Sequence, residues 1–145
     1  MVSPQMDRVI LVVDSVLADD RAKDHQELYT EHLSTIPGVE LVFTAYRADA
    51  MSILGAGSSE ISLVIIAGLV PLAKGSTKKG TASFVTMLRH QVAITCPIIA
   101  HTSDVDQRNA LMQPGLCNRY VDKGAGFEWP QLVRAVRECL ELPTE

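Results

Sequence analysis

The apolar run SLVIIAGLVP, at residues 62–71, constrains the fold of this chain more than any other feature. It lies within the longest uncharged apolar stretch, residues 61–73, which is too short to cross a bilayer. Apolar runs of this length that end in a turn are typical of central strands in a parallel sheet, buried on both faces. In open α/β sheets, functional residues follow the carboxyl ends of such strands. Here Ala67 and Gly68 hold that place, and neither carries a reactive side chain.

Four further strand-like segments alternate with helix-like ones along the chain. The other strands are expected at RVILVVDS, VELVFTA, CPIIAHTS and RYVDK, which occupy residues 8–15, 39–45, 96–103 and 119–123. The first helix has Leu28, Leu33 and Ile36 on an apolar stripe and ends at Pro37. Later helices are expected at residues 49–54, 81–91, 104–112 and 129–142, with Gly55 and Gly57 closing the first of these.

Strands that alternate with helices imply right-handed βαβ crossovers and a parallel sheet that helices cover on both faces. Five such units predict a flavodoxin-like (βα)5 fold, a three-layer sandwich around a five-stranded parallel sheet. A length of 145 residues fits a single domain. We expect residues 1–145 to form that domain, with a core from about residue 8 to residue 142.

The composition excludes several classes of function. A net charge of −4 opposes broad nucleic-acid binding, and neither a membrane span nor a secretory signal is visible. The cysteines lack CxxC spacing, so we expect reduced, mostly buried thiols in a cytoplasmic protein, without a metal: Cys96, Cys117 and Cys139. No nucleophile–base arrangement stands out, so we expect neither an enzyme nor a cofactor.

The strand ends, taken together, resemble one protein family. ILVVDS, LVIIAGLVP, PIIAHTS and GLCNRYVDKG, followed by a closing amphipathic helix, resemble the receiver domain of bacterial response regulators from about residue 8 to residue 142. Each motif alone is weak, but their order along the chain is a strong signal. The resemblance implies a signalling module of a two-component type pathway.

The resemblance also implies a site, and this chain keeps only part of it. The family has two acidic residues at the end of the first strand, where this chain has Asp14 and Ser15. The phosphate-accepting aspartate precedes a proline by four residues, and that position is Ala67. The strand-end hydroxyl and lysine are present as Thr102 and Lys123.

Two further positions come from the same resemblance. Tyr120 stands at the switch-aromatic position, three residues before the lysine, and either packs or acts as the switch. Gly124 replaces the proline that normally follows the lysine. Thr102 either responds to a ligand or bonds to the backbone. By strand alternation we expect the neighbouring His101 to point to the opposite face of the sheet from Thr102, and we expect no catalytic role for it.

The altered site predicts a pseudo-receiver. A receiver takes a phosphoryl group on a carboxylate, with Mg²⁺ held by acidic oxygens and carbonyls. Ala67 has no oxygen to phosphorylate, and loss of two acids removes most of the charge of the metal site. We expect Asp14 to pair with Lys123, although a solvated strand-end carboxylate that caps a helix is the alternative.

Two functions from different classes remain open. The first is a module that binds a kinase, a phosphotransfer protein, an output protein or a second copy of itself without phosphorylation. It would use the face of the fourth helix, fifth strand and fifth helix, which carries Gln107, Arg108, Tyr120, Arg134 and Arg137. The second is an anion or nucleotide sensor that uses the strand-end pocket and the polar loop with Lys74, Lys78 and Lys79.

Overall fold

The structure, a computed structural model, describes residues 8–14, 22–57, 61–67, 81–102, 105–124 and 126–141. At residues 22, 56–57, 81–83 and 105–107 it describes the backbone only. Strands and helices alternate in the order β1 (Arg8–Asp14), α1 (Ala22–Leu33), β2 (Val39–Thr44), α2 (Arg47–Gly57), β3 (Ile61–Ala67), α3 (Thr81–His90), β4 (Ile98–Thr102), α4 (Val105–Leu111), β5 (Arg119–Asp122) and α5 (Trp129–Cys139).

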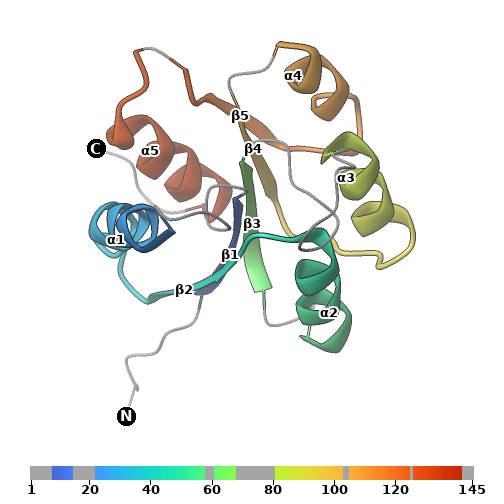
Figure 1. The fold of residues 1–145 in the computed structure, drawn as a ribbon, viewed down its shortest axis with the longest axis horizontal. Coiled ribbons are helices and arrows are strands. Elements are labelled where there is room, and N and C mark those ends of the chain that lie inside the picture. Colours follow the sequence, from blue (N-terminus) through green and yellow to red (C-terminus); the bar gives the residue numbers. More distant parts are fainter. Residues whose placement is uncertain are drawn as a thin grey trace.

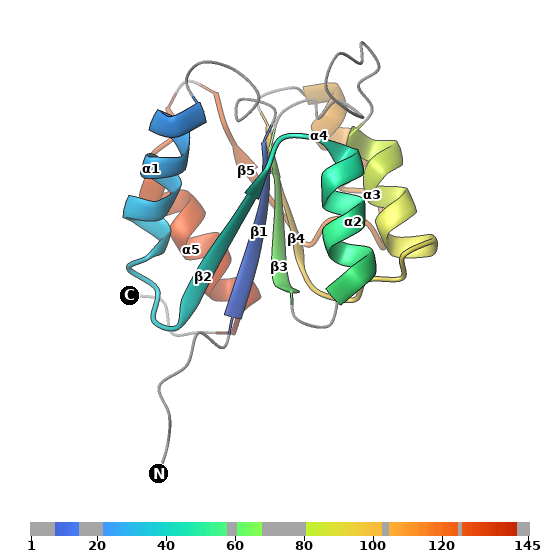
Figure 2. The same cartoon turned by 60° about the horizontal axis from the view of Figure 1, so that its bottom comes forward.

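The strands form one parallel sheet with the order β2-β1-β3-β4-β5. Helices α1 and α5 cover one face of the sheet, and α2, α3 and α4 cover the other (Figures 1 and 2). This arrangement confirms the predicted flavodoxin-like fold. The chain order reverses between β1 and β3, so the carboxyl ends of these strands mark the place where such sheets usually carry their site.

The core consists of two clusters, one on each face of the sheet. Successive side chains of β3 alternate between them: Val64 and Ile66 pack toward α2 and α3, whereas Leu63 and Ile65 pack toward α1 and α5. All four side chains have no exposed surface. Because both faces are covered, the strand must be apolar throughout, and this explains the run that dominates the sequence.

Helix α2 is longer than expected. It extends over Arg47–Gly57 rather than residues 49–54, so Gly55 lies inside the helix and does not close it. A glycine in a helix costs about 1 kcal/mol relative to alanine. Ala50 and Leu54, four residues apart on one helix face, are completely buried against the sheet, and their burial outweighs that cost.

Arg89 joins three segments at the amino-terminal edge of the sheet, opposite the candidate site. Its Nε donates to the Leu116 carbonyl at 2.9 Å, and its Nη1 donates to the carbonyls of Ile94 and Cys96 at 3.2 and 2.8 Å. Its Nη2 donates to the Asn118 side chain at 2.9 Å. This guanidinium therefore fixes the end of α3 against the segments that lead into β4 and β5.

The cysteines are free, as predicted, and most of the surface of each is buried: Cys96, Cys117 and Cys139. Each packs at the edge of a core cluster, where burial raises the pKa of its thiol. In the described part of the chain, no helix has the length and apolar character needed to span a membrane.

Candidate functional site

The carboxyl ends of β1, β3, β4 and β5 bring together the positions that the sequence singled out. Asp14 is in register with Ala67 on the neighbouring strand, and Ala67 in turn is in register with His101 of β4. Thr102 pairs with Asp122 of β5. Lys123 follows Asp122 directly, so the parallel register alone gathers these residues at one edge.

Asp14 and Lys123 form the expected ion pair. The Lys123 Nζ lies 3.1 Å from Asp14 Oδ1 and 3.0 Å from Oδ2. The Asp14 side chain has no exposed surface, whereas that of Lys123 is 25% exposed. A carboxylate buried this completely needs a positive partner and hydrogen bonds to offset its lost hydration.

Tyr29 supplies one of those hydrogen bonds, and the sequence did not predict it. Its hydroxyl donates to Asp14 Oδ2 at 2.6 Å, and its side chain is 1% exposed. Burial, together with the adjacent Asp14 carboxylate, raises the pKa of Tyr29 well above its ordinary value, so the phenol keeps its proton.

One residue of the apolar stripe expected for the first helix, Leu28, was wrong. Leu28 is 37% exposed, whereas Tyr29, Leu33 and Ile36 are the residues that face the core. A phenol is amphipathic, and it satisfies both the apolar contacts of the helix face and a polar partner at the strand end. The available signal was the i, i+4 spacing of Tyr29 and Leu33, which matches the buried face better than the spacing of Leu28.

The position opposite Asp14 on β3 is inert. Ala67 has no exposed surface and no side-chain oxygen. Among the residues that the structure describes, no group of three or more His, Cys, Asp or Glu side chains is placed to hold a metal ion. Both oxygens of Asp14 already accept hydrogen bonds, so these residues do not fit Mg²⁺, which prefers an octahedral set of oxygen ligands.

Tyr120 points toward the end of β4. Its hydroxyl donates to the Thr102 backbone carbonyl at 2.6 Å, and the Lys123 N–H donates to the same carbonyl at 3.2 Å. The Arg108 guanidinium lies 5.2 Å from the centre of the Tyr120 ring, within the range of a cation–π contact. Thr102 itself is 3% exposed. These contacts hold the ring in one orientation.

His101 faces the opposite side of the sheet from Thr102, as strand alternation predicts. Its Nδ1 donates to the Val121 carbonyl at 2.9 Å, and its ring lies 4.7 Å from that of Phe127. Burial lowers the pKa of His101 to about 4, with the Val121 hydrogen bond acting in the opposite direction. The side chain is therefore neutral at pH 7 and packs as part of the core.

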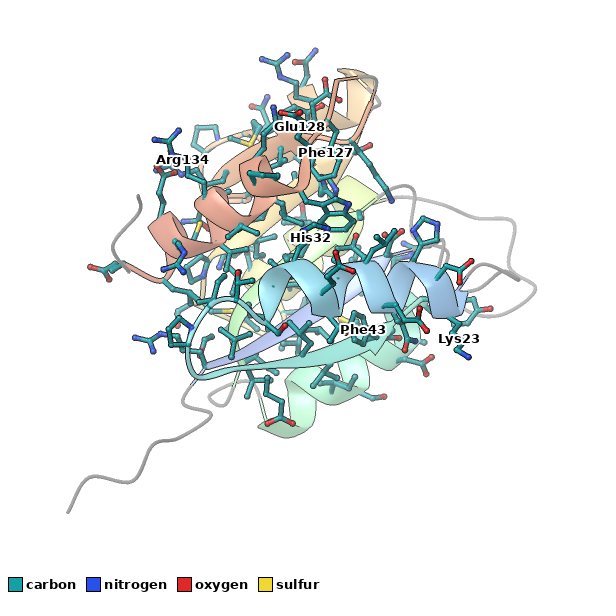
Figure 3. All side chains as sticks on the ribbon, turned by 90° about the vertical axis from the view of Figure 1, so that its left-hand side faces the viewer. Lys23, His32, Phe43, Phe127, Glu128 and Arg134 are labelled. Atoms are coloured by element: carbon teal, nitrogen blue, oxygen red, sulfur yellow. The ribbon has the colours of Figure 1, made fainter. Side chains whose placement is uncertain are left out.

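A groove of about 430 Å³ lies between β5 and α5. Tyr120, Arg119, Gln131, Arg134 and Glu138 contribute to its walls. Arg119 and Glu138 bridge it with an N–O distance of 3.3 Å. Arg134 is exposed and points away from the body of the molecule (Figure 3).

Several predicted residues lie outside the described residues. They are Ser15, which follows Asp14, and the lysines of the polar loop, Lys74, Lys78 and Lys79. The side chain of Gln107 on the expected interaction face is also outside them.

Comparisons with known proteins show which solved structures share this fold. No family model matches the chain, and no curated protein matches it. Among solved structures, the Mn²⁺-bound response regulator Rcp1 is 20% identical, with a TM-score of 0.69 over 94% of this chain and 97% of that one. A response regulator receiver domain protein from Clostridium thermocellum is 18% identical, with a TM-score of 0.65 over 92% and 94%.

A third solved structure, a candidate pilus assembly-related protein from Burkholderia pseudomallei, is 14% identical, with a TM-score of 0.65 over 100% of this chain and 98% of that one. At these identities the likeness concerns the fold. The chain therefore has the receiver-like form of the flavodoxin-like fold.

Proposed function

We propose that this chain is a receiver-like signalling module that works without phosphorylation, through contact with another protein. One observation carries the proposal. At the switch point of a receiver-like sheet, Ala67 stands where a phosphoacceptor would stand, and Asp14 forms an ion pair with Lys123. A phosphoryl group needs a free carboxylate to accept it and a divalent metal ion to neutralise its charge. Neither is provided by this arrangement, so we assign no catalytic step to the domain.

The proposed working surface, called here the α4–β5–α5 face, consists of Arg108, Arg119, Tyr120, Arg134 and Arg137. In the absence of a phosphoryl switch, this face would stay in one state and bind its partner constitutively. Two contacts support a fixed state: the Tyr120 hydroxyl bond to the Thr102 carbonyl and the Arg108 guanidinium over the same ring.

The charge of this face indicates the chemistry of the partner. Arg108, Arg119 and Arg134 are exposed there, although the chain as a whole is acidic. Glu138 neutralises Arg119 in part, and Asp122 is exposed nearby. An excess of guanidinium groups beside an aromatic ring favours a partner surface that presents carboxylates, since tyrosine and arginine dominate many protein interfaces. A kinase, a phosphotransfer protein, an output protein or a second copy would each have to provide such a surface.

The test uses single charge and hydroxyl changes on this face. Arg134→Glu and Tyr120→Phe are compared with Lys23→Glu, a change of the same kind near the start of α1, well away from Arg134 (Figure 3). Self-association is followed by sedimentation, and partners from the native host are identified by mass spectrometry after capture on each variant. We expect Arg134→Glu to reduce association or capture about tenfold or more with an unchanged melting temperature. If both face variants fold and bind like the parent, this face is not the interaction surface.

The alternative function, an anion or nucleotide sensor, requires an open strand-end pocket. Its loop lysines lie outside the described residues. Among the described residues, the Tyr29 hydroxyl and the Lys123 ammonium already bind the Asp14 carboxylate. That arrangement favours the interaction module over the sensor.

A further inference from the structure

Tyr29 is the least expected member of the strand-end site. Its ring belongs to the core between the sheet, α1 and α5, yet its hydroxyl reaches Asp14 at 2.6 Å. The ring is fixed from two sides: its centroid lies 5.2 Å from that of Trp129 in an edge-on arrangement and 6.1 Å from that of Phe43. With 1% of its side chain exposed, the phenol cannot swing into solvent without moving α1.

Tyr29 and Lys123 both act as hydrogen-bond donors to Asp14. The Lys123 ammonium and the Tyr29 hydroxyl both direct hydrogens at the carboxylate. A divalent cation in the same place would need those oxygen lone pairs for itself, and it would meet the positive charge of Lys123 at close range.

We propose that the Tyr29 hydroxyl excludes divalent cations from Asp14 by occupying the place of a cation beside its carboxylate, and that the same hydrogen bond holds helix α1 against the sheet. The loss of the acid at Ala67 is therefore not the whole reason why the site fails to fit Mg²⁺. An aspartate restored at position 67 would be in register with Asp14 but would still face a carboxylate held by the Tyr29 hydroxyl.

If the Tyr29 hydroxyl excludes divalent cations, its removal should strengthen Mg²⁺ binding only after a carboxylate has been placed at position 67. The compared proteins are the parent, Ala67→Asp, Tyr29→Phe and the double variant, each titrated with Mg²⁺ and followed by calorimetry and by melting temperature. We expect no stabilisation of the parent or of Tyr29→Phe. We expect the double variant to bind Mg²⁺ about tenfold to a hundredfold more tightly than Ala67→Asp, the range that corresponds to one hydrogen bond to a charged group.

Equal Mg²⁺ affinity of Ala67→Asp and the double variant would overturn the proposal, and so would the absence of binding in both. Because an aspartate at a fully buried position can prevent folding, a second measurement needs no change at position 67. Hydrogen exchange is compared in Tyr29→Phe and in Tyr46→Phe, which removes a hydroxyl with no hydrogen bond to any described residue.

We expect Tyr29→Phe to accelerate exchange of the α1 amides about tenfold or more relative to those of α3, because a bond that holds the helix is lost. Tyr46→Phe should leave that ratio unchanged. If Tyr29→Phe also leaves it unchanged, the hydroxyl does not tie α1 to the sheet, and the proposal fails.

Discussion

Removal of the Lys123 ammonium is the sharpest test of how this strand-end site is held together. Lys123→Met keeps most of the aliphatic stem but leaves the completely buried Asp14 carboxylate without its ion-pair partner. Removing one partner of a buried pair costs about 3 to 5 kcal/mol. Here the Tyr29 hydroxyl remains as a donor, and Lys123 is 25% exposed, so its attraction is partly screened.

We expect Lys123→Met to lower the free energy of unfolding by about 3 kcal/mol at pH 7, the lower end of that range. Urea unfolding followed by the fluorescence of Trp129, the single tryptophan, measures the change.

Two controls separate charge burial from the substitution itself. Lys23→Met replaces an exposed lysine of α1 and should change the free energy of unfolding by less than about 0.5 kcal/mol. Asp14→Asn combined with Lys123→Met removes both charges, and we expect it to recover about half of the loss. If Lys123→Met is as stable as the parent at pH 7, the ion pair does not stabilise the fold and the argument is refuted.

Three further outcomes follow from the strand-end site and the core around it. Incubation with acetyl phosphate and Mg²⁺ should leave the intact mass unchanged, because Ala67 has no acceptor oxygen; a stoichiometric phosphate on Asp14 would contradict this. The pKa of His101 is lowered to about 4, so the unfolded chain binds that proton first and stability is lost as the pH falls from about 6.5 toward 4. Between pH 7 and pH 4.5 the parent should therefore lose about 2 to 3 kcal/mol more than His101→Gln in urea unfolding. Burial raises the pKa of Cys117 to about 12, so this thiol should react with a disulfide reagent at pH 8 far more slowly in the folded than in the urea-unfolded protein; equal rates would show an open, ionised thiol.

Much of the fold follows from patterns that act along the chain. Apolar runs separated by helix-like segments leave few arrangements other than a parallel sheet between two helical layers, since crossovers are right-handed and both sheet faces need cover. The same patterns fix the strand ends, and the parallel register then gathers Asp14, Ala67, Thr102 and Lys123 at one edge. The ion pair could be predicted because Asp14 and Lys123 carry opposite charges at the ends of strands that meet at that edge.

The contacts of single side chains required the tertiary structure. Leu28 and Tyr29 are neighbours on a helix, about 100° apart around its axis, and a stripe drawn from hydrophobicity favours the leucine. Packing of α1 against Trp129 of α5 and against Asp14 of β1 turns the tyrosine inward instead. The direction of Tyr120 depends in the same way on a carbonyl of β4 and on Arg108 of α4. Local pattern thus determines which segments form strands and helices, whereas the rotation of a helix about its axis is decided by partners distant in the sequence, because those contacts exist only once the layers have packed.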